Sequence, residues 1–413
     1  MATSTRHGLR AIRALRHDPA RRPFLVIWEL TRACDLACQH CRAVAKPERD
    51  PDELTTEEGY RLLEEIVAFG RPPPLFVMTG GDPLKRPDLL DLIRAARSLG
   101  LPVAVAPSAT PALTGENLGR LREAGVTALS LSVDGSVPHI HDGFRGVPGV
   151  FDATMSAWRE ARRLGFHVQI NTTVSGTNLP NLADIARIVY REGAMTWSVF
   201  SLVPTGRGVK LRQLGPSQGE DVLHFLYDVN HTISVKTTEA PAFRRVSIQR
   251  RILEEHGRNP VTELGLGDTY LRLRAGLRAV GLAPGDGEVK RPPLPVSAGS
   301  GFLFISHTGD VSPSGFLPLA AGNVRRRSLA DIYRTSPLFT SLRDPDLLKG
   351  RCGRCEFAAV CGGSRSRAFA MTGDPLQEEG SCAYEPGSFG FSEDVALYAE
   401  QARWSPTARD LRP

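Results

Sequence analysis

The seven cysteines of the chain fall into two groups, and their spacing predicts metal-cluster chemistry. The first group is Cys34, Cys38 and Cys41, a C-x3-C-x2-C triplet that follows an apolar stretch. Three thiolates so close in sequence can bind three corners of a cubane iron–sulfur cluster and leave the fourth iron open to an external ligand. Zinc is disfavoured at this triplet, because a zinc site normally has four ligands and only three thiolates are present.

The second group lies near the C-terminus and can supply all the protein ligands of a cluster. Its spacing is C-x2-C-x5-C-x20-C, with members Cys352, Cys355, Cys361 and Cys382. Four thiolates can occupy every corner of a [4Fe-4S] cluster, and structural zinc on the same four is the alternative that the spacing leaves open. One open and one closed cluster favour radical redox chemistry over electron storage.

Composition narrows the class of protein. Of the 413 residues, 41% are hydrophobic and 23% are charged, which is ordinary for a soluble globular protein. No apolar run approaches the roughly 20 residues of a membrane span, and no basic and aromatic stripe indicates nucleic acid. An odd and sparse set of cysteines excludes a disulfide scaffold and favours a reducing cytoplasm. The Arg-rich N-terminus lacks an apolar segment, so we expect a solvated arm rather than a secretory signal; a mitochondrial transit peptide is the minor alternative.

Strand-like and helix-like segments alternate along the first half of the chain. The expected strands are 24–30, 75–78, 103–105, 128–133, 167–173 and 197–203. This alternation predicts a parallel sheet with helical crossovers, and a closed eightfold barrel usually needs about 250 residues. We therefore expect a partial, six-unit barrel, followed by a helix over 217–231 and a strand-like run over 232–236. Functional groups then belong at the carboxyl ends of the strands, where the cysteine triplet and Gly80–Pro83 both lie.

The triplet after the first strand and Gly80-Gly81-Asp82-Pro83 after the second together resemble the radical S-adenosylmethionine (SAM) superfamily. The resemblance implies an α/β fold, a partial (β/α)6 TIM-like barrel, and a [4Fe-4S] cluster whose unique iron binds the amine and carboxylate of SAM. Gly80, Gly81, Asp82 and Pro83 would contact the SAM amino group, since glycines let backbone carbonyls approach closely. The family more often has Glu where Asp82 stands.

The segment 130–135 and the arginine that follows it resemble the fourth-strand region of the same enzymes. There Ser132 and Arg145 would hold the carboxylate and ribose of SAM, Arg145 through charge-assisted hydrogen bonds. Asn171 is expected as a further SAM contact, and 203–206 would contact adenine through its backbone. The purely structural interpretation is a capped strand end and a surface arginine.

The C-terminal cysteines, with Gly362–Arg367 following Cys361, resemble the auxiliary-cluster module called SPASM, or its shorter twitch relative. A full SPASM module binds two clusters, whereas Ser314 stands here where the hairpin usually contributes a cysteine. We therefore expect a smaller α+β module with one auxiliary [4Fe-4S] cluster. The expected divisions are a basic arm (1–23), a radical SAM core (24–240), a linker or insert (241–300) and the auxiliary-cluster domain (301–413).

Within the superfamily the tail from Cys361 to Cys382 is most similar to the tetrapyrrole branch, which makes haem d1 and haem by the alternative pathway. The resemblance implies cleavage of SAM to a 5′-deoxyadenosyl radical, hydrogen abstraction from a tetrapyrrole propionate, and decarboxylation or carbon–carbon cleavage. Flavodoxin or ferredoxin would donate the electron. A peptide-modifying maturase is the first alternative, although the 23 residues before the first strand leave no room for its usual peptide-recognition domain. A non-catalytic iron–sulfur scaffold or electron carrier is the second, which the open triplet disfavours. No residue can be identified from the sequence as a catalytic acid or base.

Residues 241–300 are expected to determine substrate specificity. Helical pieces in this region carry four arginines: Arg244, Arg245, Arg250 and Arg251. They are candidates to bind propionates, but the pattern favours a solvated helix face.

Overall fold

A parallel sheet forms the centre of the molecule. The computed structural model describes residues 11–282 and 288–402, so residues 1–10 of the predicted arm and 283–287 of the predicted linker lie outside the described residues. Within the described part, one ten-stranded sheet has the order β10-β9-β8-β1-β2-β3-β4-β5-β6-β7. Its parallel core comprises β1 (Leu25–Glu29), β2 (Leu75–Thr79), β3 (Val103–Val105), β4 (Ala128–Ser132), β5 (His167–Val174), β6 (Thr196–Ser201) and β7 (Val235–Thr238).

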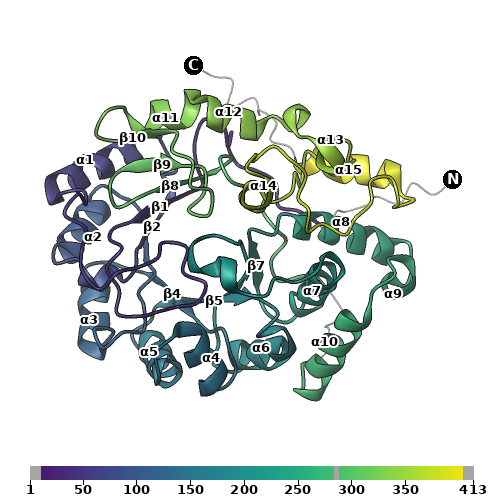
Figure 1. Cartoon of the computed structure of the whole chain (residues 1–413), viewed down its shortest axis with the longest axis horizontal. Coiled ribbons are helices and arrows are strands. Elements are labelled where there is room, and N and C mark those ends of the chain that lie inside the picture. Colours follow the sequence, from purple (N-terminus) through teal and green to yellow (C-terminus); the bar gives the residue numbers. More distant parts are fainter. Residues whose placement is uncertain (1–10, 283–287, 403–413) are drawn as a thin grey trace.

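Helices follow these strands and surround the sheet (Figure 1). They are α1 (Thr56–Val67), α2 (Leu89–Ser98), α3 (Gly115–Glu123), α4 (Pro138–Arg145), α5 (Val150–Arg163), α6 (Leu182–Arg191) and α7 (Pro216–Val229). Helix α1 shows why they form: the Thr55 hydroxyl accepts from the amide of Glu58 while the Glu58 carboxylate accepts from the amide of Thr55. Leu62, Leu63 and Ile66 then form its buried face. The arrangement confirms the predicted α/β partial barrel, which β7 extends beyond six strands.

Alternation along the strands separates the helix-facing side of the sheet from its concave side. In β5, Val168 and Ile170 are buried in the hydrophobic core with Leu182 and Ile185 of α6. Gln169 and Asn171 alternate with them along the strand and point to the opposite side, because successive side chains of a strand alternate. The inside of the curved sheet therefore carries polar side chains along β5.

The C-terminal part extends the same sheet at its other edge. Strand β8 (Phe302–Ile305) pairs in parallel with β1, and β9 (Asp310–Ser312) and β10 (Gly322–Asn323) continue antiparallel. The helices that follow these strands along the chain are α11 (Leu329–Thr335), α12 (Pro337–Arg343), α13 (Gly350–Gly353), α14 (Arg365–Thr372) and α15 (Ser392–Ala402). In the part of the chain that the structure describes, every helix is too short or too polar to cross a bilayer.

The segment between β7 and β8 contains α8 (Ala242–Glu255), α9 (Pro260–Glu263) and α10 (Asp268–Ala279). The described end of the N-terminal arm packs here: Ala11 and Ile12 are buried in a small core with Ile248 and Ile252 of α8. The prediction of a solvated arm is therefore wrong for these residues. These two apolar side chains are buried although arginines flank them in the sequence.

The prediction of a solvated basic face on α8 is also wrong. Arg245 donates to both carboxylate oxygens of Glu220, at 2.7 and 2.6 Å, and Arg250 donates to Asp228 at 2.6 Å. Arg244 donates to the carbonyl oxygens of Val296 and Cys361, while Arg251 pairs with Glu254 and Glu255 on its own helix. Buried cations need such partners. These contacts leave little support for propionate binding by α8.

Candidate functional site

The cysteine triplet lies in the loop that leaves the carboxyl end of β1. Cys34 is buried, and Cys38 and Cys41 are partly exposed. Backbone amides donate to two of the sulfurs, from Leu36 to Cys34 at 3.4 Å and from Ala45 to Cys41 at 3.5 Å. Hydrogen bonds to cluster sulfurs are one of the ways in which a protein sets a cluster's potential.

Three glycines lie against this loop: Gly81 after β2, Gly146 at the end of α4 and Gly206 after β6. A Cβ on Gly81 would lie 2.6 Å from the Arg32 carbonyl oxygen and closer still to that of Ala33; one on Gly146 would lie 2.6 Å from the Ala37 oxygen. A Cβ on Gly206 would lie 2.5 Å from the Cys41 oxygen. Backbone hydrogen bonds accompany each approach: Asp82 to Ala33, Ala37 to Arg145, and Arg207 to Cys41. The absence of a side chain at these glycines is therefore what allows the loop to pack so closely.

Asp82 fixes a neighbouring loop with its side chain. Its buried carboxylate accepts from the Thr110 hydroxyl at 2.6 Å and from the amide of Leu84 at 3.2 Å. Burial raises the pKa of this carboxyl. The Ser108 hydroxyl of the same neighbouring loop donates to the Gly81 carbonyl at 2.7 Å and lies 3.6 Å from the sulfur of Cys34. Asp82 thus has a structural role beside the triplet that the sequence did not reveal.

Arg145 is buried, so the interpretation as a surface arginine is wrong. It forms an ion pair with buried Asp134, and its Nη1 lies 3.7 Å from the sulfur of Cys38. Asp134 also accepts from the amide of Thr173 at 2.7 Å. Although burial opposes it, the charge of Arg145 holds the pKa of Asp134 below its ordinary value. The pair connects the ends of β4 and β5 to the cysteine loop and places a guanidinium beside Cys38.

Ser132 and Asn171 lie opposite one another in neighbouring strands. Their register continues across the sheet, from Ser132 on β4 to Asn171 on β5, Ser198 on β6 and Lys236 on β7. The Asn171 side chain accepts from Gln169 at 2.8 Å. This transverse row holds two of the predicted SAM contacts together with a cation, Lys236, to which the sequence analysis gave no role.

The four C-terminal cysteines line a single pocket. Its empty volume is about 450 Å³ when the part that opens to solvent is counted. Apolar Ala242 and Phe357 share its wall with the guanidinium-bearing Arg245. Burial raises the pKa of Cys361 to about 12 and that of Cys355 to about 11, so both thiols would need a bound metal to be deprotonated at neutral pH. Among the described residues, no three His, Cys, Asp or Glu side chains have the spacing of a site for one ion. The structure thus brings the four predicted cysteine ligands together at one pocket.

A carboxylate missed by sequence analysis connects the barrel to this second site. Glu239, just beyond β7, has a left-handed backbone (φ 54°). Its carboxylate accepts from three hydroxyls, those of Ser314 at 2.7 Å, Ser364 at 2.6 Å and Ser366 at 3.0 Å. Ser314, at the position where a cysteine was expected, is therefore a hydrogen-bond donor to the barrel. No local motif indicated this cluster, because its members are far apart in the sequence.

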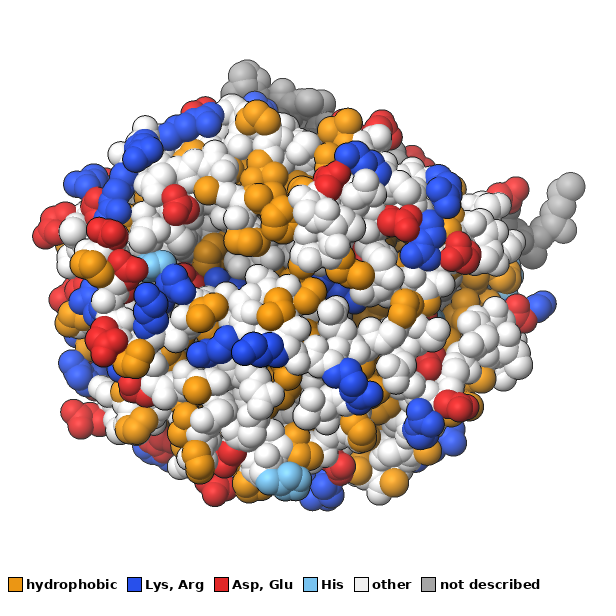
Figure 2. Space-filling view, in the orientation of Figure 1, with side chains coloured by type: hydrophobic (Ala, Val, Ile, Leu, Met, Phe, Trp, Pro, Cys, Tyr) orange, Lys and Arg blue, Asp and Glu red, His pale blue; other side chains and the backbone are white. Residues whose placement is uncertain are grey.

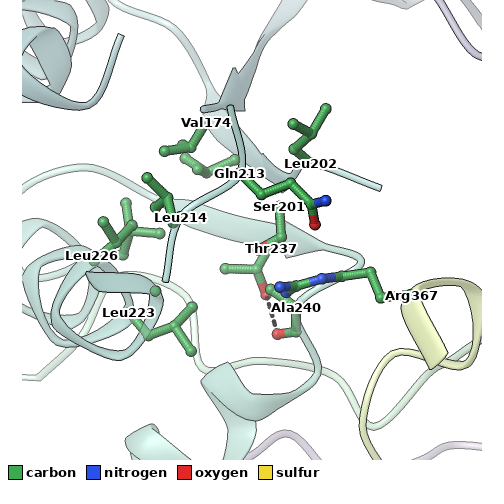
Figure 3. A pocket seen from close by; sticks show the side chains of 13 residues that line it. Val174, Ser201, Leu202, Gln213, Leu214, Leu223, Leu226, Thr237, Ala240 and Arg367 are labelled. Atoms are coloured by element: carbon green, nitrogen blue, oxygen red, sulfur yellow. Dashed lines mark hydrogen bonds between the residues drawn. The ribbon is translucent and has the colours of Figure 1, made fainter. Parts of the chain in front are cut away.

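A further pocket lies between the ends of β5 to β7 and α7 (Figure 3). Apolar side chains such as Leu223 and Leu226 form most of its wall, and Arg367 of α14 reaches its edge. Arg367 is held by Glu379 at 2.9 Å. Figure 2 shows one face of the molecule in space-filling view. Hydrophobic side chains gather toward the middle of that face, and acidic side chains lie mostly toward its rim.

Comparisons with known proteins identify the family of the chain. The family model described as the radical SAM superfamily matches residues 28–189, and the one described as an iron–sulfur cluster-binding domain, SPASM, matches residues 297–356. The chain belongs to the radical SAM superfamily. It is an enzyme of that class, and its cofactors are SAM and iron–sulfur clusters.

Its relatives include two proteins named AdoMet-dependent heme synthase. That of Oleidesulfovibrio alaskensis is 41% identical over 367 residues, which cover 88% of this chain and 87% of the relative. That of Methanosarcina barkeri is 37% identical over 374 residues, 88% of this chain and 97% of the relative. Among solved structures, Streptococcus suis SuiB bound to the precursor peptide SuiA has a TM-score of 0.63 at 14% identity, and covers 88% of this chain and 76% of its own. That likeness concerns the fold alone.

Proposed function

We propose that the protein is a haem synthase that removes propionate carboxyl groups from an iron tetrapyrrole, using SAM. The observation that carries the proposal is the 41% identity to a heme synthase over 88% of the chain, a span long enough to include both cysteine sites. The divisions expected from the sequence (1–23, 24–240, 241–300 and 301–413) belong to the proposal. The proposal also includes a flavodoxin or ferredoxin as electron donor, and a cytoplasmic location.

The reaction removes one hydrogen atom, one CO2 and one electron from each propionate that becomes a vinyl group. When bound, the open cluster and SAM supply the radical that takes the hydrogen atom, and the closed cluster supplies a one-electron acceptor. Cys34, Cys38 and Cys41 hold the first cluster. The second is held by Cys352, Cys355, Cys361 and Cys382.

The remaining predicted site residues position SAM. Arg145 brings a guanidinium to the triplet and is itself fixed by Asp134. Ser132 and Asn171 present polar side chains from the same row of the sheet. We assign these residues, with Gly80, Gly81, Asp82 and Pro83, to the SAM site; the carboxylate of Asp82 acts there by supporting the Ser108 loop.

The test is anaerobic reconstitution followed by reaction with dithionite, SAM and iron coproporphyrin. We expect about eight irons per chain, and haem, CO2 and 5′-deoxyadenosine formed in proportion. A Cys34/Cys38/Cys41→Ala variant should bind about four irons and form neither haem nor nucleoside. Cleavage of SAM without any change in the porphyrin would refute the proposal and favour a peptide-modifying maturase.

A further inference from the structure

Lys236 is a cation on the inner side of the barrel. Its neighbour Val235 is buried in the core, and its other neighbour Thr237 lines the pocket beneath α7 (Figure 3). Because successive strand side chains alternate, Lys236 points to the opposite, concave side of the sheet. Its register partners are Ser198, then Asn171, then Ser132. With strands roughly 4.8 Å apart, Lys236 lies about 10 Å along the sheet from Asn171 and about 14 Å from Ser132.

Hydrogen bonds connect the segments that carry two arginines, Arg291 and Arg13, to the start of β7. The Asn230 side chain accepts from the amide of Val235 at 3.0 Å and donates to the carbonyl of Arg291 at 2.8 Å. Two residues beyond Arg291, the carbonyl of Pro293 accepts from the amide of Arg13 at 3.0 Å. The linker before β8 and the N-terminal arm are thereby both brought to the start of β7.

The three charges are close enough to repel one another. Burial, and then Arg291 and Arg13, lower the pKa of Lys236 to about 8. Burial, Arg291 and Arg16 lower the pKa of Arg13 to about 10. Burial also lowers the pKa of Arg291. Folding thus places like charges together in a partly desolvated space, which is unfavourable unless something compensates.

No carboxylate among the described residues provides that compensation. Within residues 11–282 and 288–402, none of the three side chains forms an ion pair or donates a hydrogen bond, and Nε of Arg13 is buried without a partner. The arginines of α8 show the usual alternative, since Arg245 and Arg250 each face a carboxylate. A half-buried cation cluster without an anion is complementary to an anionic ligand.

We propose that Arg13, Lys236 and Arg291 bind a carboxylate of the substrate, one that anchors the tetrapyrrole while another propionate reacts. The inference rests on the proposed function, which supplies a substrate with several carboxylates on one rigid ring. The row of residues from Ser132 to Lys236 joins the predicted SAM contacts to the cation cluster, over a length comparable with the breadth of such a ring. The cluster would therefore fix the orientation of the substrate toward SAM and determine which side chain reacts.

The experiment measures equilibrium binding of iron coproporphyrin to the reconstituted enzyme by its absorbance, with the tetramethyl ester as an uncharged probe. Lys236→Gln and Arg291→Gln should each weaken binding of the acid about tenfold or more, because each removes a charge-assisted contact. Binding of the ester should be weak in the unmodified protein and unchanged by either substitution. Lys236→Arg, which keeps the charge, should retain most of the affinity for the acid.

Arg187→Gln is the matched control, because it removes an arginine that pairs with Asp184 on the surface of α6. Iron content and thermal unfolding, measured in parallel, identify a variant that has lost its clusters or its fold. If the unmodified enzyme binds the acid but the Gln variants bind it equally well, the cation site is wrong and the proposed function stands. If the unmodified enzyme cleaves SAM but binds neither porphyrin, both are wrong.

Discussion

Gly81→Ala should dislodge the cysteine triplet while leaving the rest of the barrel intact. The new Cβ would lie 2.6 Å from the Arg32 carbonyl oxygen and closer to that of Ala33, whereas a Cβ contact below 3.0 Å is essentially never found. Both oxygens belong to the backbone, so no side chain can rotate away, and the loop must move. Overpacking of this kind costs about 1–3 kcal/mol.

The movement would also strain two hydrogen bonds. The amides of Gly81 and Asp82 donate to the carbonyls of Thr31 and Ala33, each at 2.7 Å. Because Cys34 directly follows Ala33, a shift here separates its sulfur from those of Cys38 and Cys41. We expect Gly81→Ala to lose most of the open cluster, with about four irons per chain instead of about eight, and to lose SAM cleavage with it.

The assay counts iron and acid-labile sulfide after anaerobic reconstitution and follows 5′-deoxyadenosine. Gly119→Ala is the control, because a Cβ at this position of α3 meets nothing within 4 Å. It should keep both clusters and gain up to about 1 kcal/mol, since alanine is favoured over glycine within a helix. Wild-type iron content and SAM cleavage in Gly81→Ala would refute the argument that this glycine is required for loop packing.

Three further predictions concern the junction between the barrel and the C-terminal part. Glu58 has its pKa lowered to about 2, chiefly by hydrogen bonds from Arg325. A lowered carboxyl pKa stabilises the fold at neutral pH, and this contribution is lost as the pH falls from about 4.5 toward 2. Arg325→Gln should therefore flatten the loss of stability over that range, which unfolding curves at several pH values would show. Glu239→Ala removes the acceptor of three serine hydroxyls and should lower the unfolding free energy by about 2–3 kcal/mol in urea titration; a change under about 0.5 kcal/mol would contradict this role. Replacing Cys355 and Cys382 by Ala should reduce iron from about eight to about four per chain and abolish haem formation, whereas unchanged iron would exclude them as ligands.

The strands were predictable because their signals are local. Each apolar run that was expected to be a strand overlaps one, as the match of 24–30 to β1 and of 167–173 to β5 shows. The two cysteine spacings are local signals too, and the cluster ligands that they indicate stay a prediction. Burial inside a parallel sheet requires apolar residues in sequence, so such runs are visible before the fold is known.

Long-range partners were not predictable. The basic character of α8 suggested a solvated face, but packing against α7 brings Glu220 to Arg245 across 25 residues of sequence. Nothing in the local pattern distinguishes a buried, paired arginine from an exposed one, since both stand at helical spacing. The same holds for Lys236, whose significance depends on the register that aligns it with Ser198 and Asn171.

The contacts between the two parts of the chain explain how their clusters can act together. Glutamates of the barrel bind side chains of the C-terminal part. Glu29 accepts a hydrogen bond from His307 at 3.1 Å when Nδ1 carries the proton, and Glu58 forms an ion pair with Arg325 at 2.7 Å. Glu239 adds three serines, and β8 adds a continuous parallel pairing with β1. The rate of electron transfer between two sites depends steeply on their separation. A flexible connection between the two parts of the chain would leave that separation undefined. The paired strands and the carboxylate contacts fix that separation, and the proposed oxidation of the substrate beside one cluster can then supply an electron to the other.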